Sequence, residues 1–384
     1  MKKYSREDSI KTIAKELGFD LVGITSAEPF FRGEQESIKR IKDGFMNGLN
    51  WYTEERVRKA NRPRLLLNDA KSVISLGLNY FSEPTTEKPA TPSGRIARYA
   101  WGDDYHKVIK KKLSEFCSRL DCLVPENVES RFFVDDGPMN DRAAAERSGI
   151  GWYGKNTNIL TSSHGSWIFL AQIITNLELT ADIPLKKTCG SCVRCIDECP
   201  TSAIVAPFVI DNTKCISYLT IELKGSIPIE MRPLMGDWVF GCDICQEVCP
   251  VNESASPSKT AFGRSGTSLV ELIPLLSMTQ DEFSVFFKSS PIKRAKLVGL
   301  QRNVCVALGN IRDRAAVPAL VRALHESEYS LVRSHSAWAL GCMGGSVARG
   351  SLLDAITIEG DAEVRKEILD ALNAIDLLSL HSGM

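Results

Sequence analysis

Eight of the 12 cysteines in this chain of 384 residues fall between positions 189 and 249, seven of them in two groups. The first group, TCGSCVRCIDECP, has the spacing C-x2-C-x2-C-x3-C-P, and the second, GCDICQEVCP, repeats its last part. The first spacing is that of bacterial ferredoxins, in which the fourth cysteine ligates the other cluster of a two-cluster protein. The surrounding residues show little periodic structure, as expected where metal replaces a hydrophobic core. The segment therefore predicts a ferredoxin-like domain with two [4Fe–4S] clusters.

The second group lacks a first cysteine, and Cys215, 27 positions before Cys242, is the only nearby thiol that can take its place. Counting then predicts a crossed arrangement of the ligands. Cluster one takes Cys189, Cys192, Cys195 and Cys249. Cluster two takes Cys199, Cys215, Cys242 and Cys245. Two four-cysteine zinc sites are the alternative, but the tight spacing and the two prolines favour iron–sulfur clusters.

The composition is that of an ordinary globular protein, with 43% hydrophobic residues, 24% charged residues and a formal net charge of zero. Two or three domains are expected at this length. A neutral chain can bind nucleic acid only through a local patch. Charges interrupt the N-terminal segment every few positions, which predicts an amphipathic helix and not a signal peptide, and no apolar run approaches the ~20 residues that span a bilayer. We expect a cytoplasmic monomer without membrane contact.

Residues 1–180 alternate helical and strand-like patterns, which predicts a layered α/β domain. The expected helices are 10–17, 40–51 and 105–120, and the expected strands are 19–25, 72–80, 131–136 and 165–175. Residues 82–95, rich in proline, serine and threonine, are expected to form a loop, and residues 252–268 a linker. The cysteine-rich domain is placed at 181–260 and an α-helical domain at 280–380.

An internal repeat marks the C-terminal part of the chain. Residues 307–309, 339–341 and 371–373 read Ala-Leu-Gly, Ala-Leu-Gly and Ala-Leu-Asn, each 32 residues after the one before. Helical pairs at this period resemble HEAT repeats, slightly shorter than usual. Because one pair cannot bury its own apolar face, the repeats are expected to stack, and to pack on the cysteine-rich region.

A redox domain of α/β type raises the question of a dinucleotide. The fingerprint G-x-G-x-x-G does not follow the first expected strand, and the phosphate-binding pattern GxxxxGK[ST] does not occur. The glycine-rich segment GIGWYGKNTN at 149–158 offers backbone N–H groups and Lys155 to an anionic cofactor, or it is a plain tight turn.

Several segments together resemble the epoxyqueuosine reductase family, namely RFFVDDGPMNDRAAAERSGIGWYGKNTNIL, CGSCVRCIDECPTSAI, CISYLTIELKGSIP, GCDICQEVCP, GDDYHKVIKKKL and LGLNY. The resemblance covers about residues 5 to 255, and a HEAT-like tail also occurs in one branch of the family. It implies that the N-terminal domain binds cobalamin beside the two clusters. It also implies reduction of the epoxide of epoxyqueuosine in tRNA to queuosine, with electrons from an external donor reaching the cofactor through the clusters.

By this resemblance Asp135 lies against the corrin and is the general acid that protonates the departing oxygen. From the sequence alone, DDGP at 135–138 reads equally well as a turn with capping carboxylates. The other residues that match family positions near the corrin are Lys155, Asn156, Ser217, Cys242 and Asp243. Arg58 and Arg62 both fall near one further family contact. Near Tyr105 and His106, Ile109 replaces the glycine of the D-x-H-x-x-G pattern, so we expect no protein histidine on cobalt.

No acidic residue occurs between Phe283 and Arg312, which predicts a positive patch for tRNA phosphates. The expected contacts are Lys293, Arg294, Lys296 and Arg302. A solvated helix face is the alternative, and Lys107 and residues 110–112 form a second basic run. The rival functions are a reductive dehalogenase-like enzyme with a small substrate and an electron carrier or tRNA-binding scaffold without chemistry. The basic patch favours tRNA over a small molecule.

Overall fold

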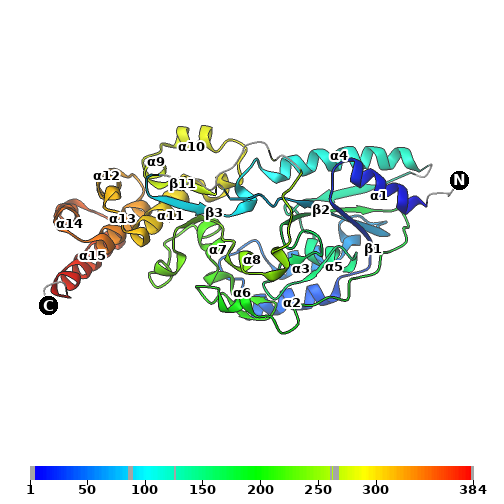
Figure 1. Ribbon diagram of the computed structural model, residues 1–384, viewed down its shortest axis with the longest axis horizontal. Coiled ribbons are helices and arrows are strands. Elements are labelled where there is room, and N and C mark those ends of the chain that lie inside the picture. The colour runs from blue at the N-terminus through cyan, green and yellow to red at the C-terminus, as the bar shows by residue number, and fades with distance from the viewer. Residues whose placement is uncertain (1–4, 85–89, 125–126, 260–261, 263–267, 382–384) are drawn as a thin grey trace. The chain divides into compact units, whose positions relative to one another are not determined.

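The structure is a computed structural model that describes residues 5–84, 90–124, 127–259, 262 and 268–381 (Figure 1). Two compact units make up the chain. The first comprises Met1–Glu83, Gly102–Thr213 and Asp243–Ser265, and the second comprises Pro84–Trp101, Lys214–Cys242 and Gly266–Met384. This division differs from the three consecutive domains expected, because the cysteine-rich segment is shared between the units. No helix of the described residues is long and apolar enough to cross a membrane.

A four-stranded sheet forms the centre of the first unit. Its order is β1 (Leu21–Ser26), β2 (Ser72–Asn79), β7 (Ile168–Thr175) and β4 (Ser130–Phe133), and each neighbouring pair is antiparallel. The two central strands are apolar and almost wholly buried, because helices cover both faces of the sheet. Helices α1 (Arg6–Glu16) and α4 (Tyr105–Leu123) lie on one side, and α5 (Asp141–Arg147) lies on the other (Figure 1).

Local signals explain where these helices begin and which face they bury. Ser5 and Asp8 form a reciprocal capping box at the start of α1, with N–H to oxygen distances of 3.0 and 3.2 Å. Asp104 caps α4, which buries Ile109, Leu113, Phe116 and Leu120, the i, i+4, i+7 and i+11 positions of an amphipathic helix. The predicted helices at 10–17 and 105–120 and all four predicted strands are therefore confirmed in type, with ends shifted by a few residues.

The predicted helix at 40–51 is wrong. Helix α2 covers Phe31–Lys42, and turns follow it until α3 begins at Glu54. Gly44 and Gly48 have φ angles of 79° and 84°, in the left-handed region that ends a helix. Other short elements of the first unit are two hairpins and two α-helices. They are β5 (Trp152–Tyr153) with β6 (Ile159–Leu160), β8 (Ile204–Ala206) with β9 (Val209–Ile210), α6 (Arg194–Asp197) and α8 (Ile244–Glu247).

The second unit contains a small mixed sheet. Strand β3 (Ser93–Ile96) pairs parallel with β10 (Trp238–Phe240) and antiparallel with β11 (Leu269–Glu271). The last part of the expected loop at 82–95 is therefore a strand, which the proline-rich composition concealed. Residues 85–89 of that loop, and 260–261 and 263–267 of the expected linker, lie outside the described residues. Helices α7 (Ile216–Ile221), α9 (Leu272–Leu276) and α10 (Gln280–Phe286) complete this part.

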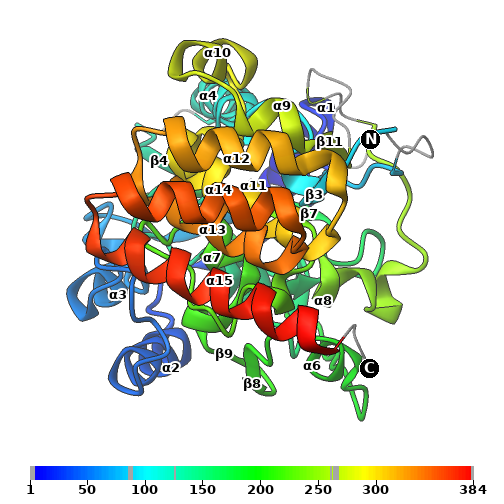
Figure 2. The ribbon, with the colours of Figure 1, turned by 90° about the vertical axis from the view of Figure 1, so that its left-hand side faces the viewer.

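The predicted helical repeat is confirmed as five helices. They are α11 (Lys296–Ile311), α12 (Val317–Glu326), α13 (Ser330–Met343), α14 (Ser346–Ile358) and α15 (Ala362–His381). Figure 2 shows α12, α14 and α15 side by side, and α11 contacts α13, which contacts α15. A Cβ atom on Gly309 would lie 2.5 Å from Cζ3 of Trp338, and one on Gly341 would lie 2.9 Å from Cα of Ala371. The 32-residue repeat of glycine thus marks where successive helices touch backbone to backbone.

Candidate active site and cluster-binding cysteines

The carboxylate of Asp135 lies just beyond the end of β4. Asp135 has a φ of 52°, a left-handed conformation that aspartate tolerates better than most residues, and its side chain is exposed. The hydroxyl of Tyr105, from the first residue of α4, donates to Oδ2 of Asp135 at 2.9 Å. The Tyr105 ring is stacked on Phe169 of β7, with centroids 4.1 Å apart and planes 7° from parallel. A rigid aromatic pair therefore orients an accessible carboxylate.

Asp136 is next in sequence but is already engaged. It forms an ion pair with Lys110 of α4 and accepts a hydrogen bond from the Val134 N–H at 3.2 Å. Partial burial raises the pKa of Asp136, but the hydrogen bonds from Lys110 and Val134 outweigh burial, so the pKa is lowered overall. The two adjacent carboxylates therefore differ in their partners. Asp136 is paired with a lysine, whereas Asp135 accepts a hydrogen bond from a tyrosine.

A third carboxyl group, that of Asp141, was missed by the sequence analysis. Its Oδ1 is buried and has no hydrogen-bond partner among the described residues. Burial raises the pKa of Asp141 well above its usual range, and the nearby Asp135 carboxylate raises it further. Asp141 is the first residue of α5, directly after the capping residue Asn140, and an acid at a helix start reads as ordinary capping. Only the burial of its carboxyl group distinguishes Asp141 from an ordinary acidic residue at the start of a helix.

His106, which is not expected to bind cobalt, lies beside the same tyrosine. Its Nδ1 is 2.7 Å from Oδ1 of Asp104, and its ring stacks on that of Tyr105 with centroids 4.1 Å apart. The hydrogen bond from His106 lowers the pKa of Asp104 against the opposing effect of burial. His106 therefore has a structural partner at the start of α4.

Thiols from both cysteine groups meet in the first unit. Burial, and then the neighbouring thiols of Cys189, Cys249 and Cys192, raise the pKa of Cys195 to about 11. Burial and the thiols of Cys189 and Cys192 likewise raise the pKa of Cys249, against hydrogen bonds from the backbone. The helical turns α6 and α8, which carry the two groups, are in contact. The last cysteine of the second group thus lies with the first three of the first group.

An unpaired donor lies against the same thiols. Trp152, Leu160 and Cys249 form a buried cluster on which Cys189 packs, and the buried indole Nε1 of Trp152 has no hydrogen-bond partner among the described residues. The sulfur atoms of an iron–sulfur cluster would supply an acceptor, and its iron ions would relieve the repulsion among thiolates. Among the described residues no group of three or more ligating side chains is close enough for a single metal ion. A four-iron cluster instead distributes its thiolates over four metal atoms.

The other four predicted ligands are placed as follows. In the first unit, Cys199 Sγ accepts a hydrogen bond from the Ala203 N–H at 3.3 Å, and Cys245 lies in α8. In the second unit, Cys215 precedes α7 and Cys242 follows β10. None of the described cysteines forms a disulfide.

The residues expected near the corrin are held in different ways. Lys155 donates to the Gly190 carbonyl at 2.8 Å, and Ser217 is half-buried. Asn156 is 3% exposed and donates to the Cys245 carbonyl at 3.1 Å, while Asp243 is 2% exposed. Asn156 and Asp243 are therefore almost wholly buried. Of the two arginines considered, Arg58 pairs with Glu54, and Arg62 binds both oxygens of Glu34 at 2.9 Å.

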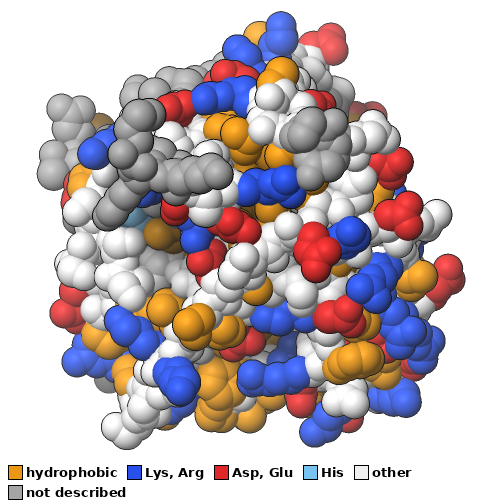
Figure 3. Space-filling view, turned by 90° about the vertical axis from the view of Figure 1, so that its right-hand side faces the viewer, with side chains coloured by type: hydrophobic (Ala, Val, Ile, Leu, Met, Phe, Trp, Pro, Cys, Tyr) orange, Lys and Arg blue, Asp and Glu red, His pale blue; other side chains and the backbone are white. Residues whose placement is uncertain are grey.

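The predicted tRNA contact Arg302 is wrong. It is fully buried, and its guanidinium donates to the carbonyls of Leu219, Leu223 and Gly225 at 2.6–2.7 Å, so phosphate cannot reach it. Lys293, Arg294 and Lys296 are exposed as expected, although Arg294 pairs with Glu222. On the face drawn in Figure 3, Lys and Arg side chains are interspersed with Asp and Glu, as a net charge of zero predicts.

The fold and the cysteines define an iron–sulfur protein of the double-cluster class with a helical-repeat tail. Residues 188–252 match the family model described as a 4Fe-4S double cluster binding domain, and residues 298–373 match that of HEAT repeats. Residues 61–136 match the model described as epoxyqueuosine reductase QueG, DUF1730. The epoxyqueuosine reductase of Cellulophaga algicola is 44% identical over 304 residues, which are 79% of this chain and 98% of the relative. The chain belongs to the epoxyqueuosine reductase family.

Solved structures agree along nearly the whole chain. A structure of epoxyqueuosine reductase with a tRNA-Tyr epoxyqueuosine-modified tRNA stem loop matches with a TM-score of 0.91 at 32% identity, covering 96% of this chain and 98% of that one. A structure of the Bacillus subtilis enzyme, with the catalytic loop of an aspartate swung out of the active site, matches with a TM-score of 0.89 at 32% identity and the same coverage.

Proposed function

We propose that this protein reduces the epoxide of epoxyqueuosine in tRNA to queuosine. The reaction takes up two electrons and two protons, opens the epoxide to an alkene and releases the oxygen as water. The observation that carries the proposal is the accessible Asp135 carboxylate, held by Tyr105 at 2.9 Å, in the segment where the family-specific match ends. The structure of the Bacillus subtilis relative also has a catalytic loop that contains an aspartate, and there the loop is swung out of the active site.

Two [4Fe–4S] clusters fit the thiols of this chain. Cys189, Cys192, Cys195 and Cys249 are proposed for cluster one, and Cys199, Cys215, Cys242 and Cys245 for cluster two. The mutual effect of the first four thiols on their pKa values and the unpaired indole of Trp152 support cluster one. Clusters pass single electrons, and no side chain of the chain can deliver an electron pair to an epoxide carbon.

Cobalamin is the cofactor proposed to supply that reducing pair. Lys155, Asn156 and Ser217 would contact it, together with the backbone of Cys242 and Asp243. Asp135 would hold the proton that the departing oxygen needs, and Tyr105 would keep its carboxyl in place by donating to Oδ2. Because Asp136 is occupied by Lys110, it takes no part in this transfer.

Nucleoside analysis of tRNA tests the function directly. A bacterial strain that lacks this gene should accumulate epoxyqueuosine, and plasmid-borne copies of the wild-type chain and of Asp136→Asn should restore queuosine. A copy with Asp135→Asn should not restore it. Normal queuosine in the deletion strain, in the absence of a second gene for the same step, would refute the proposal.

Single cysteine replacements test the crossed ligand assignment. Cys199→Ser should damage cluster two although Cys199 belongs to the first group, and Cys249→Ser should damage cluster one although it belongs to the second. Electron paramagnetic resonance of the reduced variants, compared with Cys195→Ser and Cys245→Ser, distinguishes the clusters. The signal lost in Cys249→Ser should be the one lost in Cys195→Ser. If each group holds its own cluster, Cys249→Ser will instead match Cys245→Ser.

Salt dependence tests the proposed tRNA patch. Lys293→Gln with Lys296→Gln should weaken binding of a tRNA stem loop and lower the slope of log K against log salt by about 0.7–0.9 per lysine. Lys366→Gln, an exposed lysine of α15 outside the patch, serves as the control and should leave the slope unchanged. Filter binding over a range of salt concentrations measures both. The patch is excluded if the double variant keeps the slope of the parent.

A further inference from the structure

Polar side chains of α11 are buried against the segment that runs from Cys215 to Cys242. Cys215 directly precedes α7, and Cys242 follows β10 after a single glycine. These two elements are in contact, and α11 contacts both. The Gly241 N–H, one residue before Cys242, donates to Oγ1 of Thr220 in α7 at 2.9 Å. The backbone that follows Cys215 and the backbone that precedes Cys242 are therefore joined within the second unit.

Asn303 of α11 makes the same connection from the side of the repeats. Its Nδ2 donates to the carbonyl of Thr220 in α7 and to the carbonyl of Val239 in β10, each at 2.8 Å. Asn303 is fully buried, so both bonds are shielded from water. One amide group therefore fixes the distance between the helix that follows Cys215 and the strand that precedes Cys242.

Arg302 holds that amide and the end of α7. Its Nε and Nη2 donate to Oδ1 of Asn303 at 3.1 and 2.8 Å, which sets the orientation of the amide. Its remaining bonds reach the carbonyls of Leu219, Leu223 and Gly225. These carbonyls lie where α7 ends, so the guanidinium satisfies acceptors that the helix leaves unpaired. A buried cation with five hydrogen bonds and no carboxylate partner among them points to a structural purpose.

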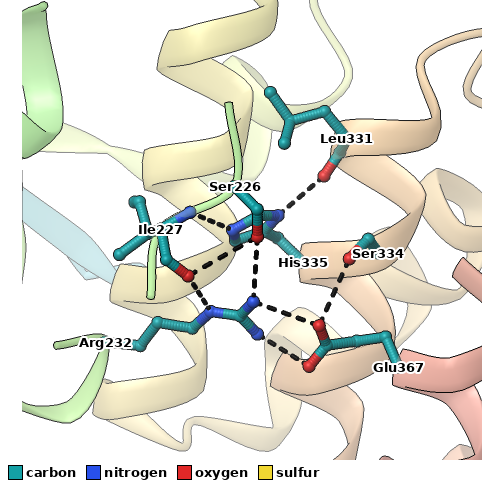
Figure 4. A network of polar contacts seen from close by, with 7 residues as sticks. All are labelled: Ser226, Ile227, Arg232, Leu331, Ser334, His335 and Glu367. Carbon is teal, nitrogen blue, oxygen red and sulfur yellow. Dashed lines mark hydrogen bonds and ion pairs between the residues drawn. The ribbon is translucent and has the colours of Figure 1, made fainter. Parts of the chain in front are cut away.

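A second contact of the repeats holds the middle of the same segment (Figure 4). Glu367 of α15 binds Arg232, whose Nε donates to the Ile227 carbonyl at 2.9 Å. His335 of α13 accepts from the Ile227 N–H at 3.2 Å and donates from Nδ1 to the Leu331 carbonyl at 2.8 Å. Burial, and then the nearby Arg232, hold the pKa of His335 well below its usual value, which keeps the ring neutral for these two roles.

We propose that Arg302 and Asn303 are positioning residues for cluster two, and that the repeat helix α11 serves to fix the spacing of Cys215 and Cys242. The inference rests on the ligands proposed above for that cluster. Residues that orient metal ligands commonly change metal affinity by about 10–100-fold when they are replaced. The buried face of α11 then belongs to the electron-transfer apparatus, while only its exposed neighbours Lys293 and Lys296 remain for RNA.

Asn303→Ala tests this, with Asn310→Ala as a matched control. Asn310 lies on the same helix and also bridges two carbonyls, those of Arg232 and Gly236, each at 2.8 Å. These two residues lie farther from Cys215 and Cys242 along the chain than Thr220 and Val239 do. In anaerobically reconstituted full-length protein, Asn303→Ala should lose the cluster-two resonance to an iron chelator about 10-fold faster than the parent. Cluster one should keep its signal, and Asn310→Ala should behave as the parent does.

Thr220→Val provides a second variant in case Asn303→Ala does not fold. It keeps the size of the side chain and removes the acceptor for the Gly241 N–H, together with the hydrogen bonds that Oγ1 of Thr220 donates to the carbonyls of Ile216 and Ser217 within α7. The inference is overturned if both variants fold and lose cluster two at the parental rate, or if both clusters are lost together. Cys215→Ser distinguishes a failure of the positioning role from a failure of the ligand assignment. If Cys215→Ser keeps both clusters, the assignment itself fails, whereas loss of cluster two there with no effect in Asn303→Ala refutes only the positioning role.

Discussion

Asp135→Asn is expected to lower turnover of an epoxyqueuosine-containing tRNA stem loop by roughly 10²–10⁴, the contribution usual for a positioned general acid. Asparagine has the size of aspartate and tolerates the left-handed conformation with φ of 52°, so the local backbone should not change. Tyr105 can still donate to the amide oxygen. What is lost is the proton that the leaving oxygen requires. Single-turnover conversion by pre-reduced enzyme measures this step.

Asp136→Asn is the matched control. A strand over 131–136, as predicted, would turn the side chains of Asp135 and Asp136 to opposite faces, but β4 ends at Phe133. The expected difference in turnover between Asp135→Asn and Asp136→Asn rests on the ion pair of Asp136 with Lys110. Asp136→Asn should therefore leave turnover nearly unchanged. Similar losses in the two variants, or near-normal turnover in Asp135→Asn with its cofactors bound, would remove Asp135 from the reaction.

The predictions that succeeded rest on patterns a short segment carries by itself. Helix period, apolar strands and the two glycines 32 residues apart, Gly309 and Gly341, each reflect a local requirement, and the structure bears them out. The predicted helix at 40–51 failed because its apolar residues looked helical while Gly44 and Gly48 adopt left-handed turns. Glycine permits both outcomes, and packing with other segments decides between them.

Arg302 was misjudged and Asp141 was overlooked because burial is not a local property. A basic residue in a window without acids reads as part of a positive surface, but α11 is buried over most of its length. One signal was present, since Arg302 is the only charged residue between Lys296 and Arg312, and a single charge among apolar residues predicts a buried, fully bonded side chain. For Asp141 the sequence offers no such contrast. The division of the cysteine-rich segment between two units likewise depends on long-range contacts.

Glu367→Leu is expected to destabilise the second unit by about 3–5 kcal/mol, because it leaves the charge of Arg232 buried without its partner. The Arg232 side chain is 3% exposed and that of Glu367 is 13% exposed, with nitrogen–oxygen distances of 2.8 and 3.1 Å in a two-pronged pair. The remaining bonds of Arg232, to the Ile227 carbonyl and to Oγ of Ser226, are to uncharged acceptors and cannot replace a carboxylate. Urea unfolding followed by far-ultraviolet circular dichroism measures the loss.

Asp376→Asn, on the same helix α15, breaks the exposed pair with Arg349 and should leave the urea midpoint almost unchanged, because water solvates both groups. Replacing both members of the buried pair, as Arg232→Met with Glu367→Leu, should recover much of the stability lost in Glu367→Leu alone, since no isolated charge remains. Equal shifts for Glu367→Leu and Asp376→Asn would mean that water reaches Arg232 after all. A double variant less stable than Glu367→Leu would instead show that the bonds of Arg232 to Ile227 and Ser226, and not its charge pair, hold the segment between Cys215 and Cys242.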